Sequence, residues 1–160
     1  MLYLWLTLFA AFIVAADQFT KYLTVANIPL YGGVEFMPGF LRLTYIRNTG
    51  GGWSILSQHT WLLIVLSCVF LLVIVFAIYK KWFTGKATLI SLFAVLGGGV
   101  GNLIDRIRLG YVVDMIETEF ISFPVFNVAD CFISCGAIAL CLFVLLEDTK
   151  AKKNRKEGDA

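Results

Sequence analysis

Two aspartates in this sequence have surroundings that suit acid–base chemistry. Asp114 lies in the apolar run 112–116, where neither a strand nor a turn calls for a carboxylate. Burial without a cation would raise the pKa of this group and leave it holding a proton. Asp130 opens an apolar block further along the chain. Two carboxylates that share one proton can hydrolyse a peptide bond, because one activates water while the other protonates the carbonyl oxygen.

Helix capping is the simpler interpretation of Asp130 and its neighbour Asn127. Asn is a preferred N-cap residue, and an acid in the first turn is favoured by the helix dipole. Taken alone, the pair fits a cap better than a catalytic site. Its position close to the loop that holds Asp114 places the two aspartates within reach of each other and keeps the catalytic interpretation open.

Asp17 and Lys21 are a second pair of ionisable residues inside apolar sequence. They are four positions apart, the favourable spacing and orientation for an ion pair on a helix. Ionisable groups at membrane depth are costly and usually face the interior of a bundle or a wet cavity. The alternative is that both side chains cap the helix and reach the membrane surface.

Asn102, Asp105 and Arg106 form a third polar group at the end of an apolar block. Arg106 suits a helix C-terminus, whereas Asp105 opposes the dipole there. We therefore expect Asp105 to pair locally with Arg106 or Arg108. An anchoring role for these residues is at least as consistent with the sequence as a catalytic one.

The composition identifies the elements that must position these residues. The 160 residues are 59% hydrophobic and 15% charged, the mean hydropathy is +0.84, and a soluble domain carries charge at roughly a quarter of its positions. A bilayer core needs ~20 consecutive apolar residues in a helix. The sequence predicts an all-α polytopic membrane protein with four transmembrane helices, at approximately 2–25, 60–79, 88–104 and 128–146.

The connections carry two further signals. Segments 40–46 and 111–116 are rich in strand-forming residues, which predicts a small β-rich subdomain that includes the outer loop 31–56. Basic residues gather between the second and third spans and after the fourth. The positive-inside rule therefore puts both termini in the cytoplasm and the loops 26–59 and 105–127 outside. We expect one membrane domain over 1–148, then a basic cytoplasmic tail over 149–160 that is disordered beyond its first turn.

Along its whole length apart from the basic tail, the chain resembles the type II, or lipoprotein, signal peptidase family. Five segments carry the resemblance in the right order and at the right places relative to four spans. They are Asp17-Gln18-Phe19-Thr20-Lys21, Asn48-Thr49-Gly50-Gly51-Gly52-Trp53, Gly101-Asn102-Leu103-Ile104-Asp105-Arg106, Val112-Val113-Asp114-Met115-Ile116 and Phe126-Asn127-Val128-Ala129-Asp130.

The resemblance implies an aspartic endopeptidase of the bacterial cytoplasmic (inner) membrane, with its active site near the outer face. Such enzymes cut prolipoproteins just before a diacylglyceryl-modified cysteine, use no metal or cofactor, and are inhibited by globomycin-like cyclic peptides. Asp114 and Asp130 match the family's catalytic pair. The positions expected to bind substrate or support the site are Asp17, Lys21, Asn48, Gly50, Asn102, Asp105, Arg106, Asn127 and Ala129. The chain departs from the family pattern at 51–54, where Gly51-Gly52-Trp53-Ser54 makes a more flexible loop.

Other functions fit the sequence less well. A small ion- or proton-coupled transporter would spread acids along the depth of the bundle, and the last three apolar blocks carry none before their outer ends. A metal-dependent lipid phosphotransferase would need more clustered carboxylates. A Ser54–Lys21 pair stays open but leaves Asp114 unexplained, and a net charge of +2 implies no nucleic-acid partner.

Overall fold

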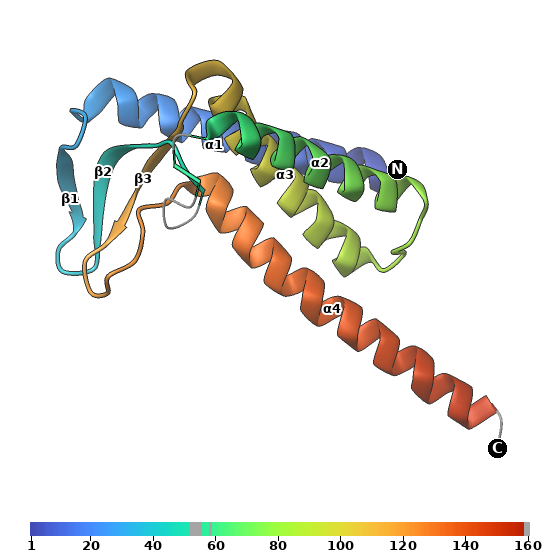
Figure 1. Ribbon diagram of the computed structural model, residues 1–160. Coiled ribbons are helices and arrows are strands. Elements are labelled where there is room, and N and C mark those ends of the chain that lie inside the picture. Colours follow the sequence, from blue (N-terminus) through green and yellow to red (C-terminus); the bar gives the residue numbers. More distant parts are fainter. Residues whose placement is uncertain (52–55, 58, 159–160) are drawn as a thin grey trace.

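The computed structural model of the chain describes residues 1–51, 56–57 and 59–158. In the described residues, four helices are long and apolar enough to cross a membrane, and three strands form one sheet. Figure 1 shows this sheet at one end of the helices, which confirms the predicted fold class. In chain order the elements are α1 (Leu2–Asn27), β1 (Gly33–Met37), β2 (Leu41–Asn48), α2 (Thr60–Tyr79), α3 (Lys86–Leu109), β3 (Val112–Thr118) and α4 (Val128–Gly158).

Helix α3 extends further than the sequence pattern predicts. It continues past residue 104 and ends at Leu109, so Asp105 and Arg106 lie within its last turns. Gly110 stops the helix in a left-handed conformation, with φ of 80°, and its N–H donates to the Arg106 carbonyl. Glycine adopts this conformation without a steric penalty, which is why it ends so many helices.

Helix α4 also exceeds its expected length. Its apolar part covers Val128–Glu147, and the helix then continues to Gly158. The expectation of disorder beyond the first turn of the tail is therefore wrong. Lys, Arg, Ala and Glu are good helix formers, and extending an existing helix avoids the cost of nucleation.

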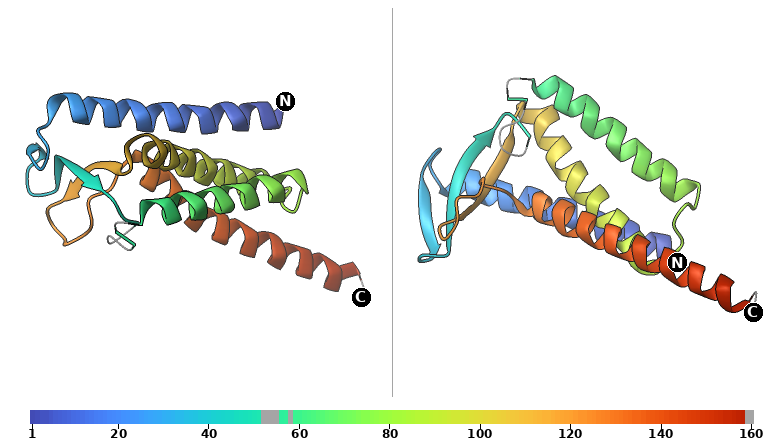
Figure 2. Two further views of the ribbon diagram at one scale, coloured as in Figure 1. Left: turned by 45° about the horizontal axis from the view of Figure 1, so that its top comes forward. Right: turned by 60° about the horizontal axis from the view of Figure 1, so that its bottom comes forward.

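Helix α3 is the centre of the bundle and packs against each of the other three helices. In the right-hand view of Figure 2, α2 and α4 lie on opposite sides of it. Its glycines allow this close packing. A Cβ atom at Gly97 would lie 2.9 Å from the Ala10 carbonyl oxygen of α1, and one at Gly98 would lie 2.5 Å from the Ala129 carbonyl oxygen of α4. Backbone from two other helices therefore occupies the space that side chains would take.

The sheet has the order β1-β2-β3 with antiparallel neighbours. It includes both predicted strand regions and β1, which lies within the predicted β-rich loop. A shift in register between Leu43 and Ile46 of β2 places Ile46 opposite Asp114. Buried Ile28, after α1, packs with Tyr45 and neighbouring residues of β3. This contact fixes the sheet to the C-terminal end of α1.

The glycine packing predicts a difference between two neighbouring substitutions. We expect Gly98→Ala to lower the free energy of unfolding by about 1–3 kcal/mol, because the new methyl group meets the backbone of α4, which cannot move independently. Gly99→Ala is the matched control, since its methyl group would meet only the end of the Leu71 side chain, which can rotate. Denaturant unfolding in detergent micelles measures both. Equal stability of the two variants would contradict this account of the α3–α4 contact.

Candidate active site

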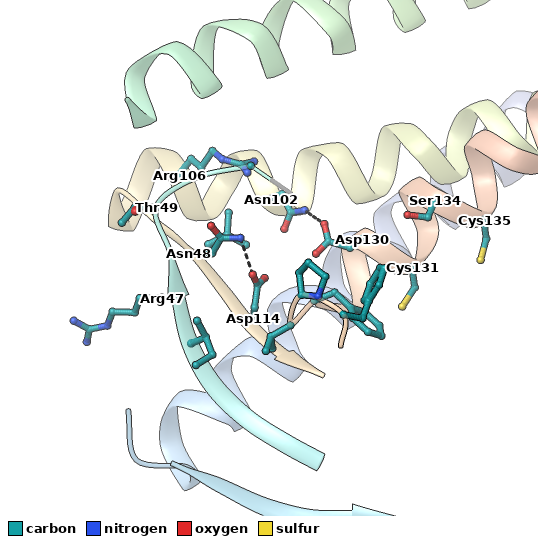
Figure 3. Close-up of a pocket in the computed structure, with 17 residues that line it drawn as sticks. Arg47, Asn48, Thr49, Asn102, Arg106, Asp114, Asp130, Cys131, Ser134 and Cys135 are labelled. Atoms are coloured by element: carbon teal, nitrogen blue, oxygen red, sulfur yellow. Dashed lines mark hydrogen bonds between the residues drawn. The ribbon is translucent and has the colours of Figure 1, made fainter. Parts of the chain in front are cut away.

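Asp114 and Asp130 line the same cavity of about 660 Å³. Figure 3 shows Asp114 projecting from β3 and Asp130 from the start of α4, with Asn102 and Arg106 of α3 nearby. These residues come from three consecutive elements, and the structure brings Asp114 and Asp130 to one cavity, as predicted. A smaller cavity of about 220 Å³ between α2, α3 and α4 is also lined by Asn102, Arg106 and Asp130. Asp130 therefore lines both cavities.

Both oxygens of Asp114 accept hydrogen bonds from amide side chains. Asn48 Nδ2 donates to Oδ2 at 2.9 Å, and Asn127 Nδ2 donates to Oδ1 at 2.6 Å. The residue is only 2% exposed. Burial raises the pKa of Asp114 to about 6, with the charge of Asp130 acting in the same direction and the hydrogen bond from Asn48 opposing it. The raised pKa agrees with the expectation drawn from the apolar sequence around this residue.

Asp130 takes part in capping α4 and also lines the cavity. Its N–H donates to Asn127 Oδ1 at 2.9 Å, and its Oδ2 accepts from the Asn127 N–H at 3.2 Å. This reciprocal pair is a capping box, with aspartate in the usual place of glutamate. The other oxygen, Oδ1, accepts from Asn102 Nδ2 at 2.7 Å. The capping interpretation is thus confirmed without excluding a catalytic role.

Lys21 connects two acidic side chains and also contacts Asn102, which lines the cavity. Its Nζ lies 2.8 Å from Asp17 Oδ2 and 3.0 Å from Asp105 Oδ2, and it donates to Asn102 Oδ1 at 2.9 Å. All four residues are buried. The predicted Asp17–Lys21 pair is confirmed, and the alternative in which both reach the membrane surface is wrong. The expected pairing of Asp105 with Arg106 or Arg108 is also wrong, because α3 turns Asp105 toward α1 and its cation there.

The same two acids also bind the backbone beside the cavity carboxylates. Asp17 Oδ1 accepts from the Ala129 N–H at 3.0 Å, one residue before Asp130. Asp105 Oδ2 accepts from the Val113 N–H at 3.0 Å, one residue before Asp114. A single ammonium group therefore lies at the junction of the two backbone segments that carry the carboxylates.

Gln18 belongs to this cluster, although the sequence analysis does not assign it to the site. Its Nε2 donates to Asp105 Oδ1 at 2.9 Å and to the Gly101 carbonyl at 3.2 Å. The available signal is its residue type, because an amide at membrane depth needs a partner as a charge does.

Arg106 contacts the loop that follows β2. Its Nη2 donates to the Gly50 carbonyl at 3.3 Å, while the Gly50 N–H donates to Asn48 Oδ1 at 2.9 Å. Gly50 is thereby held beside Asn48, which donates to Asp114. Of the departure from the family pattern at 51–54, residues 52–54 lie outside the described residues, and with them Ser54 of the alternative Ser–Lys pair. Lys21 itself is held as a cation by two carboxylates, which does not suit a general base.

The Lys21 cluster predicts a large loss of stability on removal of the cation. Lys21→Met leaves Asp17 and Asp105 buried without a positive partner, and breaking such a buried pair costs about 3–5 kcal/mol. Arg42→Met is the matched control, because its pair with Glu117 is exposed and 3.9 Å long, and such pairs contribute about 0–1 kcal/mol. Unfolding measured in micelles should separate the two variants.

A second change tests the physical cause. Adding Asp105→Asn to Lys21→Met removes one of the uncompensated charges, so the double variant should be more stable than Lys21→Met alone. Additive losses in the double variant would contradict a charge-based origin of the effect.

Known proteins that are similar to this chain are peptidases of one family. The family model for signal peptidase (SPase) II matches residues 9–146. The chain is 44% identical to the lipoprotein signal peptidase of Enterococcus faecalis over 94% of its own length and 93% of the relative. It is 41% identical to that of Lactococcus lactis subsp. lactis over 84% and 89% of the two chains.

Solved structures show the same fold. One bacterial membrane enzyme structure matches with a TM-score of 0.84 at 34% identity, over 91% of this chain and 89% of the other. A second matches with a TM-score of 0.79 at 32% identity, over 86% and 90%. Four apolar helices, a shared fold and a family match over most of the length lead to one conclusion: this chain belongs to the signal peptidase II family of membrane peptidases.

Proposed function

We propose that this protein removes signal peptides from prolipoproteins by cutting N-terminal to a diacylglyceryl-modified cysteine, with Asp114 and Asp130 as an aspartic dyad. The proposal depends above all on one observation. Two carboxylates from different elements line one cavity, and each is oriented by amide donors. The prolipoprotein substrate is suggested by the relatives, which are lipoprotein signal peptidases.

The dyad hydrolyses the peptide with one shared proton. The ionised carboxylate takes a proton from water, whose oxygen attacks the carbonyl carbon, while the protonated carboxyl gives its proton to the carbonyl oxygen. Collapse of the tetrahedral intermediate breaks the C–N bond. The proton taken from water passes to the leaving amine, and one hydroxyl of the intermediate returns its proton to the carboxylate that acted as the acid. The raised pKa of Asp114 favours this residue as the acid.

The amides and Arg106 position the reacting groups. Asn48 and Asn127 hold Asp114, and Asn102 holds Asp130. Arg106 lines both cavities, so its guanidinium is available to bind a substrate carbonyl. Gly50 and Ala129 contribute through their backbone contacts with Arg106 and Asp17.

The walls of the larger cavity suit a lipid-bearing peptide. One wall is the apolar segment 123–126, and another is the face of α4 with Cys131, Ser134 and Cys135. That face belongs to a helix apolar enough to span the membrane. A substrate anchored in the same bilayer by its signal segment and its acyl chains would reach the carboxylates at a fixed height. The bilayer would then hold the scissile bond and the carboxylates in position for reaction.

The competing transporter function predicts acids along the depth of the bundle. Asp17, Asp105 and Asp130 instead lie together near the sheet, linked through Lys21 and Asn102. This clustering favours one reaction site over an ion path.

We also propose that both termini are cytoplasmic and that the sheet and cavity lie at the outer face of the bacterial inner membrane. The support is the excess of basic residues between α2 and α3 and after α4. A reporter fused after Lys156 should be cytoplasmic, and one inserted in the turn at Gly39 should be external. The opposite pattern would put the site on the inner face.

Replacing either dyad residue should abolish cleavage. We expect Asp114→Asn and Asp130→Asn each to lower turnover by several orders of magnitude, because Asn keeps the size but cannot cycle a proton. The double variant should be scarcely worse than either single, since the two residues act as a unit. Cleavage of a diacylglyceryl-modified prolipoprotein by purified, folded protein measures this, with Asp148→Asn, beyond the apolar span, as the control.

Three outcomes separate this mechanism from its alternatives. A pure capping role predicts that Asp130→Asn loses about 1 kcal/mol of stability and keeps its activity. Equal cleavage of unlipidated precursor would contradict positioning by the lipid. We expect activity to persist in EDTA and to be inhibited by globomycin-like cyclic peptides, and loss of activity with EDTA would point to a metal instead.

The pH profile tests the role of Asp114 as the acid. Because its pKa is raised to about 6, kcat/KM should fall as the pH rises through about 6 and the acid ionises. Asn48→Ala removes a hydrogen bond that stabilises the ionised form, so the pKa should rise and the falling limb should move to higher pH. Asn27→Ala, which removes an amide that donates to the Leu23 carbonyl, should leave the limb in place. A limb that stays fixed in Asn48→Ala would contradict the assignment.

A further inference from the structure

The free end of the sheet carries an apolar cluster that the proposed reaction does not use. Two turns meet there, one between β1 and β2 and one after β3 (Figure 1). They present Met37, Phe40, Phe120 and Ile121, which are 48%, 48%, 53% and 51% exposed. These four residues are called the apolar tip below.

The apolar tip is a built structure in which two distant segments are joined. The rings of Phe40 and Phe120 are stacked, with centroids 4.6 Å apart and planes within 6°. The Glu119 N–H donates to the Phe40 carbonyl at 3.1 Å, and Glu119 Oε2 accepts from the Gly39 N–H at 2.9 Å. The polar groups of the turns therefore bond to each other, which leaves the apolar side chains as the outer surface.

The rest of the sheet beside the tip has a polar face. Glu35, Arg42 and Glu117 are cross-strand partners on β1, β2 and β3, and Arg42 pairs with Glu117 at 3.9 Å. Charged residues thus cover this face, while the four residues of the tip carry no charge, and the neighbouring Glu119 is bound to the Gly39 N–H. Such a division between polar and apolar surfaces is typical of elements that lie in a membrane interface.

The position of the tip limits what can cover it. Ile121 precedes the start of the α4 span at Val128 by seven residues, and the bridge between Ile116 and Phe126 folds this segment back. Phe123, between the tip and the span, lines the larger cavity. The tip is therefore close in the chain to the membrane-crossing part of α4, and Phe123 between them is also exposed.

From these contacts we infer that the apolar tip inserts into the interfacial region of the outer leaflet and anchors the free end of the sheet to lipid. The tip would be surrounded by the boundary between lipid headgroups and acyl chains, where aromatic and apolar side chains are stabilised. A second anchor, opposite the contact of the sheet with α1, fixes the height of β2 and β3 above the bilayer. This inference holds whether or not the proposed reaction is correct.

Tryptophan reporters test the insertion directly. Trp5, Trp53, Trp61 and Trp82 are first replaced by Phe, and Phe120→Trp is then added. The matched control is Glu35→Trp, on the polar face of the adjoining strand. Both proteins are placed in bilayers that contain lipids brominated near the glycerol end of the acyl chains, and quenching by these lipids is compared with quenching by aqueous iodide. We expect the Phe120→Trp reporter to be quenched several-fold more by the brominated lipid, and the Glu35→Trp reporter several-fold more by iodide.

A second probe leaves the native tryptophans in place. p-Cyanophenylalanine at position 40 or 120 should show the nitrile stretching frequency of a dehydrated site in bilayers, and at position 35 that of a hydrated one. Hydrated nitriles at 40 and 120, or equal iodide quenching of both tryptophan reporters, would overturn the inference. Protection of the tip only after addition of prolipoprotein would also overturn it, because the tip would then bind protein.

Discussion

The arrangement of the site depends on the neutralisation of one ammonium group inside the membrane part of the protein. Lys21 has three N–H donors, and all three are used, by Asp17, Asp105 and Asn102. An unpaired charge at this depth is expensive, so the native packing of α1 against α3 is strongly favoured over any packing that separates these groups. Because Asp17 and Asp105 also bind the backbone of α4 and β3, the same charge balance sets where Asp130 and Asp114 lie.

Close helix packing lets short acidic side chains reach their partners on neighbouring helices. An aspartate extends only two carbons from the backbone, so Asp17 can bind the Ala129 N–H only if α1, α3 and α4 lie close together. The glycines of α3 allow this, and Gly101 lies directly against the Asp17 carboxylate, which a Cβ would approach to 2.6 Å. The buried acids therefore depend on the glycines of α3, because only closely packed helices bring these short side chains within reach of their partners.

Asparagine side chains connect the ion cluster to the cavity without adding charge. Asn102 Oδ1 accepts from Lys21 and from Asn127, while its Nδ2 donates to Asp130. Asn127 donates to Asp114 and also caps α4. Within the part of the chain that the structure describes, no buried side-chain nitrogen or oxygen lacks a partner. A fully satisfied network of this kind holds its members, the two cavity carboxylates included, in one geometry.

The sequence by itself determined the membrane class, the four spans and the presence of strands, because hydrophobic length and strand-forming residues are local properties. It also singled out Asp114, since a carboxylate inside an apolar run has no local explanation. It could not identify Lys21 as the partner of Asp105, or Gln18 as a member of the cluster, because both contacts join α1 to α3 across more than eighty residues. Nor could it show that Asp130 is a cap and a cavity carboxylate together, because each of its oxygens has a different partner. Those assignments depend on which faces of the helices meet, and only the tertiary structure decides this.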